Sequence, residues 1–95
     1  MEKQIKVMYT LLNQIELYLN GKITRQTFNF IAEEYYTENA DLIVNTKFHE
    51  VYSQIVPDAC LFYIDEPGYE VDKEKCFHKE MEKAYELLKP LCDNL

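Results

Sequence analysis

Apolar residues recur at intervals of three and four along most of this chain, and no other feature limits the fold as strongly. Spacing of this kind places the apolar side chains on one face of an α-helix. After the first such run come Asn20 and Gly21, which both tolerate the left-handed conformation that ends many helices. The pattern therefore predicts a first helix that stops at this pair, with an apolar face made of Ile5, Met8, Leu12, Ile15 and Leu19.

A second helix is predicted to begin immediately afterwards. Thr24 can accept hydrogen bonds from the free N–H groups of a helix start, and Ile23 and Phe28 have the spacing of a hydrophobic staple. With so short a connection, the first two helices should pack antiparallel. The expected apolar face contains Phe28, Ile31, Ala32 and Tyr35, with Glu33 and Glu34 facing water.

Two further helices follow in the second half of the chain. The third is expected to begin near Asp41, a possible N-cap, and to be ended or bent by Pro57, because proline removes a backbone donor. The last is expected to begin after Asp72, a second possible N-cap, and to be ended or kinked by Pro90. Their apolar faces are Phe48, Val51, Tyr52 and Ile55 in the third helix and Phe77, Met81, Ala84, Tyr85 and Leu88 in the last.

The connection between these two helices has no clear periodicity. Residues 59–64 form a short apolar run that fits a helical turn or a strand, and Pro67-Gly68 is typical of a turn. Because no partner strand is evident, we expect an irregular or partly helical connection over residues 58–69. The sequence thus predicts an all-α protein, a small antiparallel four-helix bundle, with residues 1–95 forming one domain.

Negative charge is concentrated in one part of the chain. The net charge is −7, and residues 57–72 contain five acidic residues and no basic one. Repulsion from phosphates argues against direct binding of nucleic acid or of an anionic membrane, so a cationic protein is the expected partner. Solubility alone could also account for a charge of this size.

The aromatic content points to the same stretch. The chain has eight tyrosines and no tryptophan, and tyrosine is enriched in protein interfaces. Tyr18, Tyr35, Tyr52 and Tyr85 fall on the expected core faces, which leaves Tyr36, Tyr63 and Tyr69 as interface candidates. A solvated loop with two packed tyrosines is the competing interpretation. The candidate partner-binding residues are Asp58, Tyr63, Asp65, Glu66, Tyr69, Glu70 and Asp72.

Motifs for catalysis or metal binding are missing from the sequence. His49 and His78 lack partners at metal-ligand spacing, and with two glycines in all the chain cannot form a phosphate-cradling loop. The three cysteines, Cys60, Cys76 and Cys92, form no CxxC pair and are expected to be small buried hydrophobes. We therefore expect no enzyme activity, metal or cofactor. No membrane span or secretory signal is evident, and the free cysteines fit a cytoplasmic protein. A monomer is expected, because the helices can bury their apolar faces against one another.

Three short strings resemble the colicin D immunity family of bacterial proteins. They are YLNGKIT at 18–24 followed by Phe28, PDA at 57–59 closing the third helix, and YEVD at 69–72 before the final helix. With their similar order and spacing, the likeness covers most of the chain. The chain departs from the family pattern at Ser53 and Val56, where acids are expected, and residues 63–68 look like added length.

The resemblance implies a small helical bundle that neutralises a cognate toxin. Its partner would be a basic tRNA-cleaving nuclease domain, whose active-site cleft is occupied by acidic groups of the immunity protein. Asp58 matches the acid after the family's proline, and Glu70 and Asp72 match the acids before the last helix. Two other functions fit the residues: a helical adaptor for a cellular protein, and a nucleic-acid mimic that blocks a DNA-binding protein.

Overall fold

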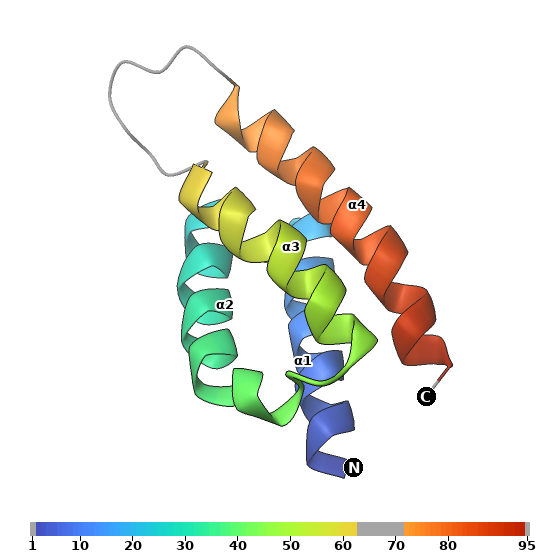
Figure 1. The fold of residues 1–95 in the computed structure, drawn as a ribbon. Coiled ribbons are helices and arrows are strands. Elements are labelled where there is room, and N and C mark those ends of the chain that lie inside the picture. Colours follow the sequence, from blue (N-terminus) through green and yellow to red (C-terminus); the bar gives the residue numbers. More distant parts are fainter. Residues whose placement is uncertain (1, 63–71, 95) are drawn as a thin grey trace.

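Four α-helices form an all-α bundle in the computed structural model, which describes residues 2–62 and 72–94. The predicted fold class is confirmed. α4 lies along α1 and α3, while α2 packs against α1 on the side away from α4 (Figure 1). In chain order the elements are α1 (Glu2–Leu19), α2 (Arg25–Asn39), the 3₁₀ turn η1 (Ala40–Leu42), α3 (Lys47–Phe62) and α4 (Lys73–Asp93).

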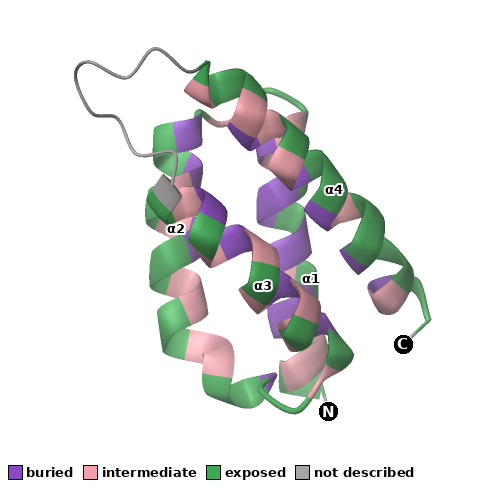
Figure 2. Cartoon of the chain, turned by 45° about the horizontal axis from the view of Figure 1, so that its top comes forward, coloured by how far each residue is buried: buried purple, intermediate pink, exposed green. Residues whose placement is uncertain are grey.

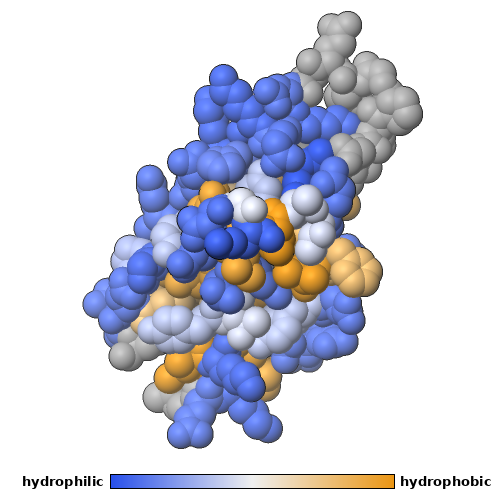
Figure 3. Space-filling model, turned by 180° about the vertical axis from the view of Figure 1, so that it is seen from behind, coloured by the Kyte–Doolittle hydropathy of each residue, from blue (hydrophilic) through white to orange (hydrophobic). Residues whose placement is uncertain are grey.

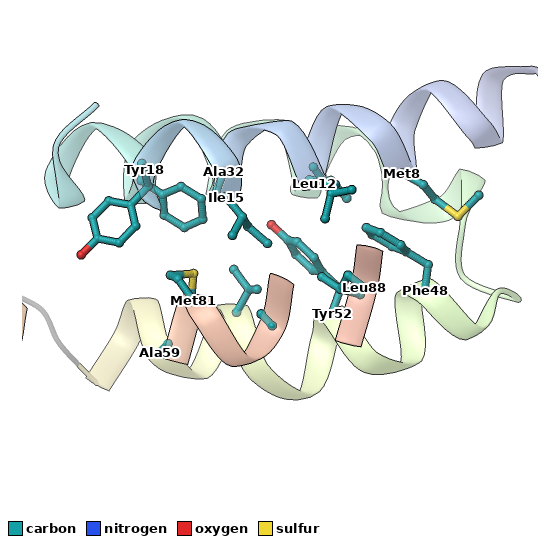
Figure 4. Packing of buried hydrophobic residues seen from close by; sticks show 14 of the residues in the cluster. Met8, Leu12, Ile15, Tyr18, Ala32, Phe48, Tyr52, Ala59, Met81 and Leu88 are labelled. Carbon is teal, nitrogen blue, oxygen red and sulfur yellow. The ribbon is translucent and has the colours of Figure 1, made fainter. Parts of the chain in front are cut away.

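The apolar faces predicted from the spacing meet in one cluster inside the bundle, except that Ile31 is not part of it (Figures 2 and 4). At one end Tyr18, Phe28 and Phe77 form an aromatic group, with ring centroids 5.2–5.9 Å apart. Each of these rings comes from a different helix, so the group joins α1, α2 and α4. The helices contribute unequally to the core. α1 buries seven residues, whereas α2 buries only Arg25, Phe28 and Ala32.

The end of α1 follows the prediction from Asn20-Gly21. Gly21 has a φ of 72°, the left-handed conformation that suits glycine. Its N–H donates to the carbonyl of Tyr18 at 3.0 Å, and the N–H of Lys22 donates to the carbonyl of Leu17 at 2.9 Å. This pair of bonds is the Schellman motif, which satisfies carbonyls left free at a helix end. The chain can therefore reverse into α2 within a few residues.

Substitution of Gly21 by alanine is expected to destabilise the bundle by about 1–2 kcal/mol. A Cβ at this position would meet no atom within 4 Å, so the cost comes from backbone conformation alone. The midpoint of urea unfolding measures it. Gly21→Asn serves as the control, because asparagine tolerates the left-handed region and should lose less. Equal stability of the alanine variant and the parent would contradict this account of the turn.

The two predicted N-caps at Thr24 and Asp72 are confirmed. Thr24 is extended, and its Oγ1 accepts a hydrogen bond from the backbone N–H of Thr27 at 3.1 Å. The Oδ1 of Asp72 accepts from the N–H of Lys75 at 3.0 Å. In both helices the cap satisfies a donor that the helix itself leaves unpaired.

The predicted start of α3 near Asp41 is wrong. Ala40–Leu42 forms the 3₁₀ turn, and α3 begins at Lys47. Thr46 caps it, because its Oγ1 accepts from the N–H of His49 at 3.1 Å while donating to the carbonyl of Ile43 at 2.7 Å. Ile43, which directly follows the 3₁₀ turn, is fully buried in the core.

Neither internal proline ends its helix. α3 continues through Pro57 to Phe62, and α4 continues through Pro90 to Asp93. The PDA string at 57–59 therefore lies inside α3 and does not close it. Packing accounts for the continuation, since Ala59 and Cys92, each two residues beyond a proline, are buried in the core. Residues 58–62 of the uncertain connection are helical, and the rest of it lies outside the described residues.

Candidate partner-binding site

Two of the seven predicted site residues, Asp58 and Asp72, belong to the described parts of the chain. Both are exposed. Asp58 lies in the last part of α3 and Asp72 caps α4, at the same end of the bundle (Figure 1). The other five, Tyr63, Asp65, Glu66, Tyr69 and Glu70, lie outside the described residues. The two exposed carboxylates thus mark the ends of the acidic stretch.

A groove with a volume of about 370 Å³ runs between α2 and α3. Its walls are mainly apolar, and the sequence had indicated neither the groove nor which helices would form it. Among its lining residues, Tyr36 had been predicted as an interface candidate and Tyr52 as a core residue. The lining residues are Asn29, Ala32, Glu33, Tyr36, Thr37, Tyr52, Val56, Pro57, Cys60 and Leu61.

Tyr36 links the two walls of the groove. Its hydroxyl lies 2.9 Å from the Nε2 of His49, and its ring stacks on that imidazole at 5.8 Å. The ring also lies 5.2 Å from that of Tyr52. Tyr36 is thus half-buried against α3, and burial raises the pKa of its hydroxyl. Its contacts hold α2 and α3 in register beside the groove.

Two polar atoms of residues that line the groove lack a hydrogen-bond partner among the described residues. They are the hydroxyl of Tyr52 and the Oδ1 of Asn29, both buried from solvent. Tyr52 is 1% exposed, and burial raises the pKa of its hydroxyl. Figure 4 shows this hydroxyl directed away from α3, toward the helices opposite. Buried polar groups are normally paired, so two unpaired ones beside one groove are unusual.

The electrostatic character of the groove is negative. Glu33 is exposed and is the charged residue in its lining, which contains no basic side chain. Burial raises the pKa of the neighbouring Cys60 thiol from 9.0 to about 11, and the Glu33 carboxylate adds to that shift. Leu61 is 73% exposed on the α3 wall. The groove therefore combines apolar contact area with one free negative charge.

A second polar cluster joins α1, α2 and α4 at the end of the bundle. Arg25, only 5% exposed, places its Nε 3.4 Å from the Oε1 of Glu74. Glu74 also accepts a hydrogen bond from the hydroxyl of Tyr18. The pKa of that hydroxyl is raised, first by burial and then by Glu74. Arg25 stands in the first turn of α2, where the helix dipole disfavours a cation. Glu74 offsets this, which gives the cluster a structural role.

Sequence reasoning had not identified Arg25, since a charged residue at a helix start is usually solvated. Of the four tyrosines expected on core faces, Tyr18 and Tyr52 are buried in the core, and Tyr35 and Tyr85 are partly buried against it. The face shown in Figure 3 is mostly hydrophilic, with apolar side chains between the polar ones. Phe30 on α2 is an exposed apolar residue, with 68% of its surface accessible.

Within residues 2–62 and 72–94, no group of three His, Cys, Asp or Glu side chains is arranged to hold a metal ion. Of the helices described, none has both the length and the apolar composition of a membrane span. Comparison of the chain with protein-family models, with curated proteins and with solved structures finds no match.

Proposed function

We propose that this protein is an immunity protein that binds and neutralises a cognate bacterial nuclease toxin. The observation that carries the proposal is the charge distribution. Residues 57–72 hold five acids and no base, and the bounding carboxylates of Asp58 and Asp72 are exposed at one end of the bundle. The helical fold and the three strings that resemble the colicin D immunity family support the same function.

The mechanism would be electrostatic occlusion of a basic active-site cleft. Nuclease clefts are lined with cations that bind substrate phosphates, and clustered carboxylates can take the place of those phosphates. Long-range attraction then speeds the encounter between the two proteins, in a salt-dependent way. An inhibitor of a lethal enzyme must also dissociate slowly, so we propose a Kd of about 1 nM or lower, roughly −12 kcal/mol. The preferred partner is a tRNA-cleaving nuclease domain.

Reversing two charges of the acidic stretch tests this function. The double variant Asp58→Lys/Asp65→Lys is expected to bind the toxin's nuclease domain about 30-fold more weakly, chiefly through slower association. The proposal predicts that the neighbouring upstream gene encodes a toxin with a basic C-terminal nuclease domain, and that domain is the one to use, with binding measured by surface plasmon resonance. Asp72 is left intact because it caps α4.

The matched control is Asp41→Lys/Glu86→Lys, which makes the same change in net charge at exposed positions away from the acidic stretch. It should bind within about threefold of the parent, since general attraction falls off over about one Debye length. Equal weakening by both double variants would show a non-specific charge effect. Unchanged binding by the first would rule out the acidic stretch as the interface.

A further inference from the structure

We propose that Tyr18 and Arg25 are positioning residues of the toxin-binding surface, acting through Glu74. Their bonds to Glu74 hold the start of α4 in place, and with it the exposed carboxylate of Asp72. This role rests on the proposed function, because it concerns the same surface. Neither Tyr18 nor Arg25 belongs to the acidic stretch, and both precede it by a wide separation in the chain.

The first turn of α4 contributes no residue to the core. None of residues 73–76 is buried, and the first core residue of the helix is Phe77, more than one helical turn after Asp72. Asp72 caps this turn: its Oδ1 accepts from the N–H of Lys75 at 3.0 Å, and its carbonyl accepts from the N–H of Cys76 at 3.1 Å. These bonds shape the turn but do not attach it to another helix.

Glu74 connects this turn to two other helices. Its Oε1 lies 3.4 Å from the Nε of Arg25 in α2, and its Oε2 accepts a hydrogen bond from the hydroxyl of Tyr18 in α1. Arg25 and Tyr18 are only 5% and 4% exposed, and the Tyr18 ring packs against Phe28 and Phe77. Because packing fixes both anchors, their bonds restrict the turn that begins at the cap of α4.

A carboxylate that is already held in place binds a basic surface better than a mobile one, because less conformational freedom is lost on binding. Asp72 is such a carboxylate, exposed at the boundary of the acidic stretch. The Glu74 side chain is itself 58% exposed and could contact the partner directly. Tyr18 and Arg25 offer almost no surface for contact, so variants of these two residues isolate the effect of position.

Tyr18→Phe removes the hydroxyl bond to Glu74 and keeps both the ring and the net charge. We expect it to bind the nuclease domain about fivefold more weakly, mainly through faster dissociation, as measured by surface plasmon resonance. Tyr85→Phe is the matched control. The hydroxyl of Tyr85 also joins α4 to a glutamate of α1, Glu16, at 3.3 Å, but far along α4 from its start. The control should bind like the parent.

Arg25→Met tests the sign of the effect. The variant makes the net charge of −7 more negative by one, so attraction to a basic domain alone predicts faster association and tighter binding. Positioning predicts the opposite, about tenfold weaker binding, because Glu74 loses one of its anchors. Tyr18→Phe leaves the ion pair and the core packing intact, and it decides the matter if Arg25→Met does not fold.

A double-mutant cycle with Asp72→Asn shows whether the effect passes through Asp72. Asparagine caps helices as well as aspartate does, so α4 should begin as before while the carboxylate is lost. Asp72→Asn should weaken binding by itself, and Tyr18→Phe should cause no further loss in that background. A general loss of stability would instead weaken binding by the same factor in both backgrounds.

Amide hydrogen exchange followed by NMR tests the turn without the toxin. In Tyr18→Phe the N–H groups of Lys75 and Cys76 should exchange about fivefold faster, while that of Ala84 in the middle of α4 exchanges as in the parent. Equal acceleration along the whole helix would show general destabilisation and contradict a local role for the cluster.

The failure of this inference differs from the failure of the proposed function. With a parent protein that binds the nuclease domain, the positioning role is overturned by unchanged binding of Tyr18→Phe, by tighter binding of Arg25→Met, or by unchanged binding of Asp72→Asn. An equal loss from Tyr18→Phe in both backgrounds of the cycle also overturns it. A parent protein that does not bind the nuclease domain would refute the proposed function, and the binding role of the cluster with it.

Discussion

Replacing Phe28 with alanine is expected to lower the free energy of unfolding by about 3–5 kcal/mol. Phe28 is completely buried and contacts the rings of Tyr18 and Phe77, so the truncation removes packing between three helices at once. Small domains have a total stability of only about 5–15 kcal/mol. The loss should therefore appear as a fall of more than about 10 °C in the Tm, measured by circular dichroism.

Phe30→Ala provides a matched control for this experiment. It makes the same chemical change two residues further along α2, at a side chain that is 68% exposed. Its cost should stay within about 0.5 kcal/mol, as for most surface substitutions. If the two variants unfold at the same temperature, α2 does not pack on the bundle through Phe28 and the described orientation of the helix is wrong.

Alkylation of Cys60 at pH 8 is expected to be about 100-fold slower in the folded protein than in the same chain in urea. The thiolate is the reactive form, and burial raises the pKa of this thiol from 9.0 to about 11, with a further contribution from Glu33. The thiolate fraction at pH 8 falls accordingly. The rate can be followed by mass spectrometry of the peptide that contains Cys60 after reaction with iodoacetamide.

The raised pKa of the Cys60 thiol also makes the free energy of unfolding depend on pH. The folded state favours the neutral thiol, so this contribution to stability is fully present below about pH 9 and is lost as the pH rises through about 11. Cys60→Ser, whose hydroxyl does not titrate in this range, should unfold with a weaker dependence on pH above 9. Equal alkylation rates in the folded and unfolded chains would show that Cys60 is not shielded on the α3 wall.

Local signals in the sequence were enough to predict much of the fold. A helix end such as Gly21 and caps such as Thr24 and Asp72 depend on atoms a few residues apart, so neighbouring residues identify them. The apolar faces follow from helix geometry for the same reason. Capping residues did not predict the start of α3 correctly, because Asp41 and Thr46 can both cap a helix. Thr46 is the cap in the structure, and Ile43 before it is buried in the core. That burial depends on packing against other helices, which local sequence does not show.

The prolines show a second limit of local reasoning. An interior proline costs a helix about 3 kcal/mol, a penalty large enough to predict a break. Burial of Ala59 and Cys92 beyond the two prolines supplies compensating packing that only the assembled bundle reveals. The groove could not be predicted for a related reason. It depends on which helices lie beside each other, and apolar spacing within α2 or α3 does not specify the neighbour.

Some features of the candidate site could be predicted from the sequence, and others required the structure. The acidity of residues 57–72 is a property of the sequence and could be located without coordinates. The unpaired hydroxyl of Tyr52 could not, since the same spacing that places a tyrosine in a core does not show whether its oxygen finds a partner. The buried position of Arg25 was equally hidden, because its partner Glu74 is far away in the chain.

The small share of the core that α2 contributes has a consequence for ligand binding. Phe28, Ala32 and Arg25 are its buried residues, so its amide hydrogen bonds should open locally at less cost than those of α1. A ligand that bridges α2 and α3 can bind only while both walls are in place. By mass action it then adds RT ln(1 + [L]/Kd) to the free energy that keeps α2 docked. Binding of such a ligand and the local folding of α2 would then be one coupled equilibrium.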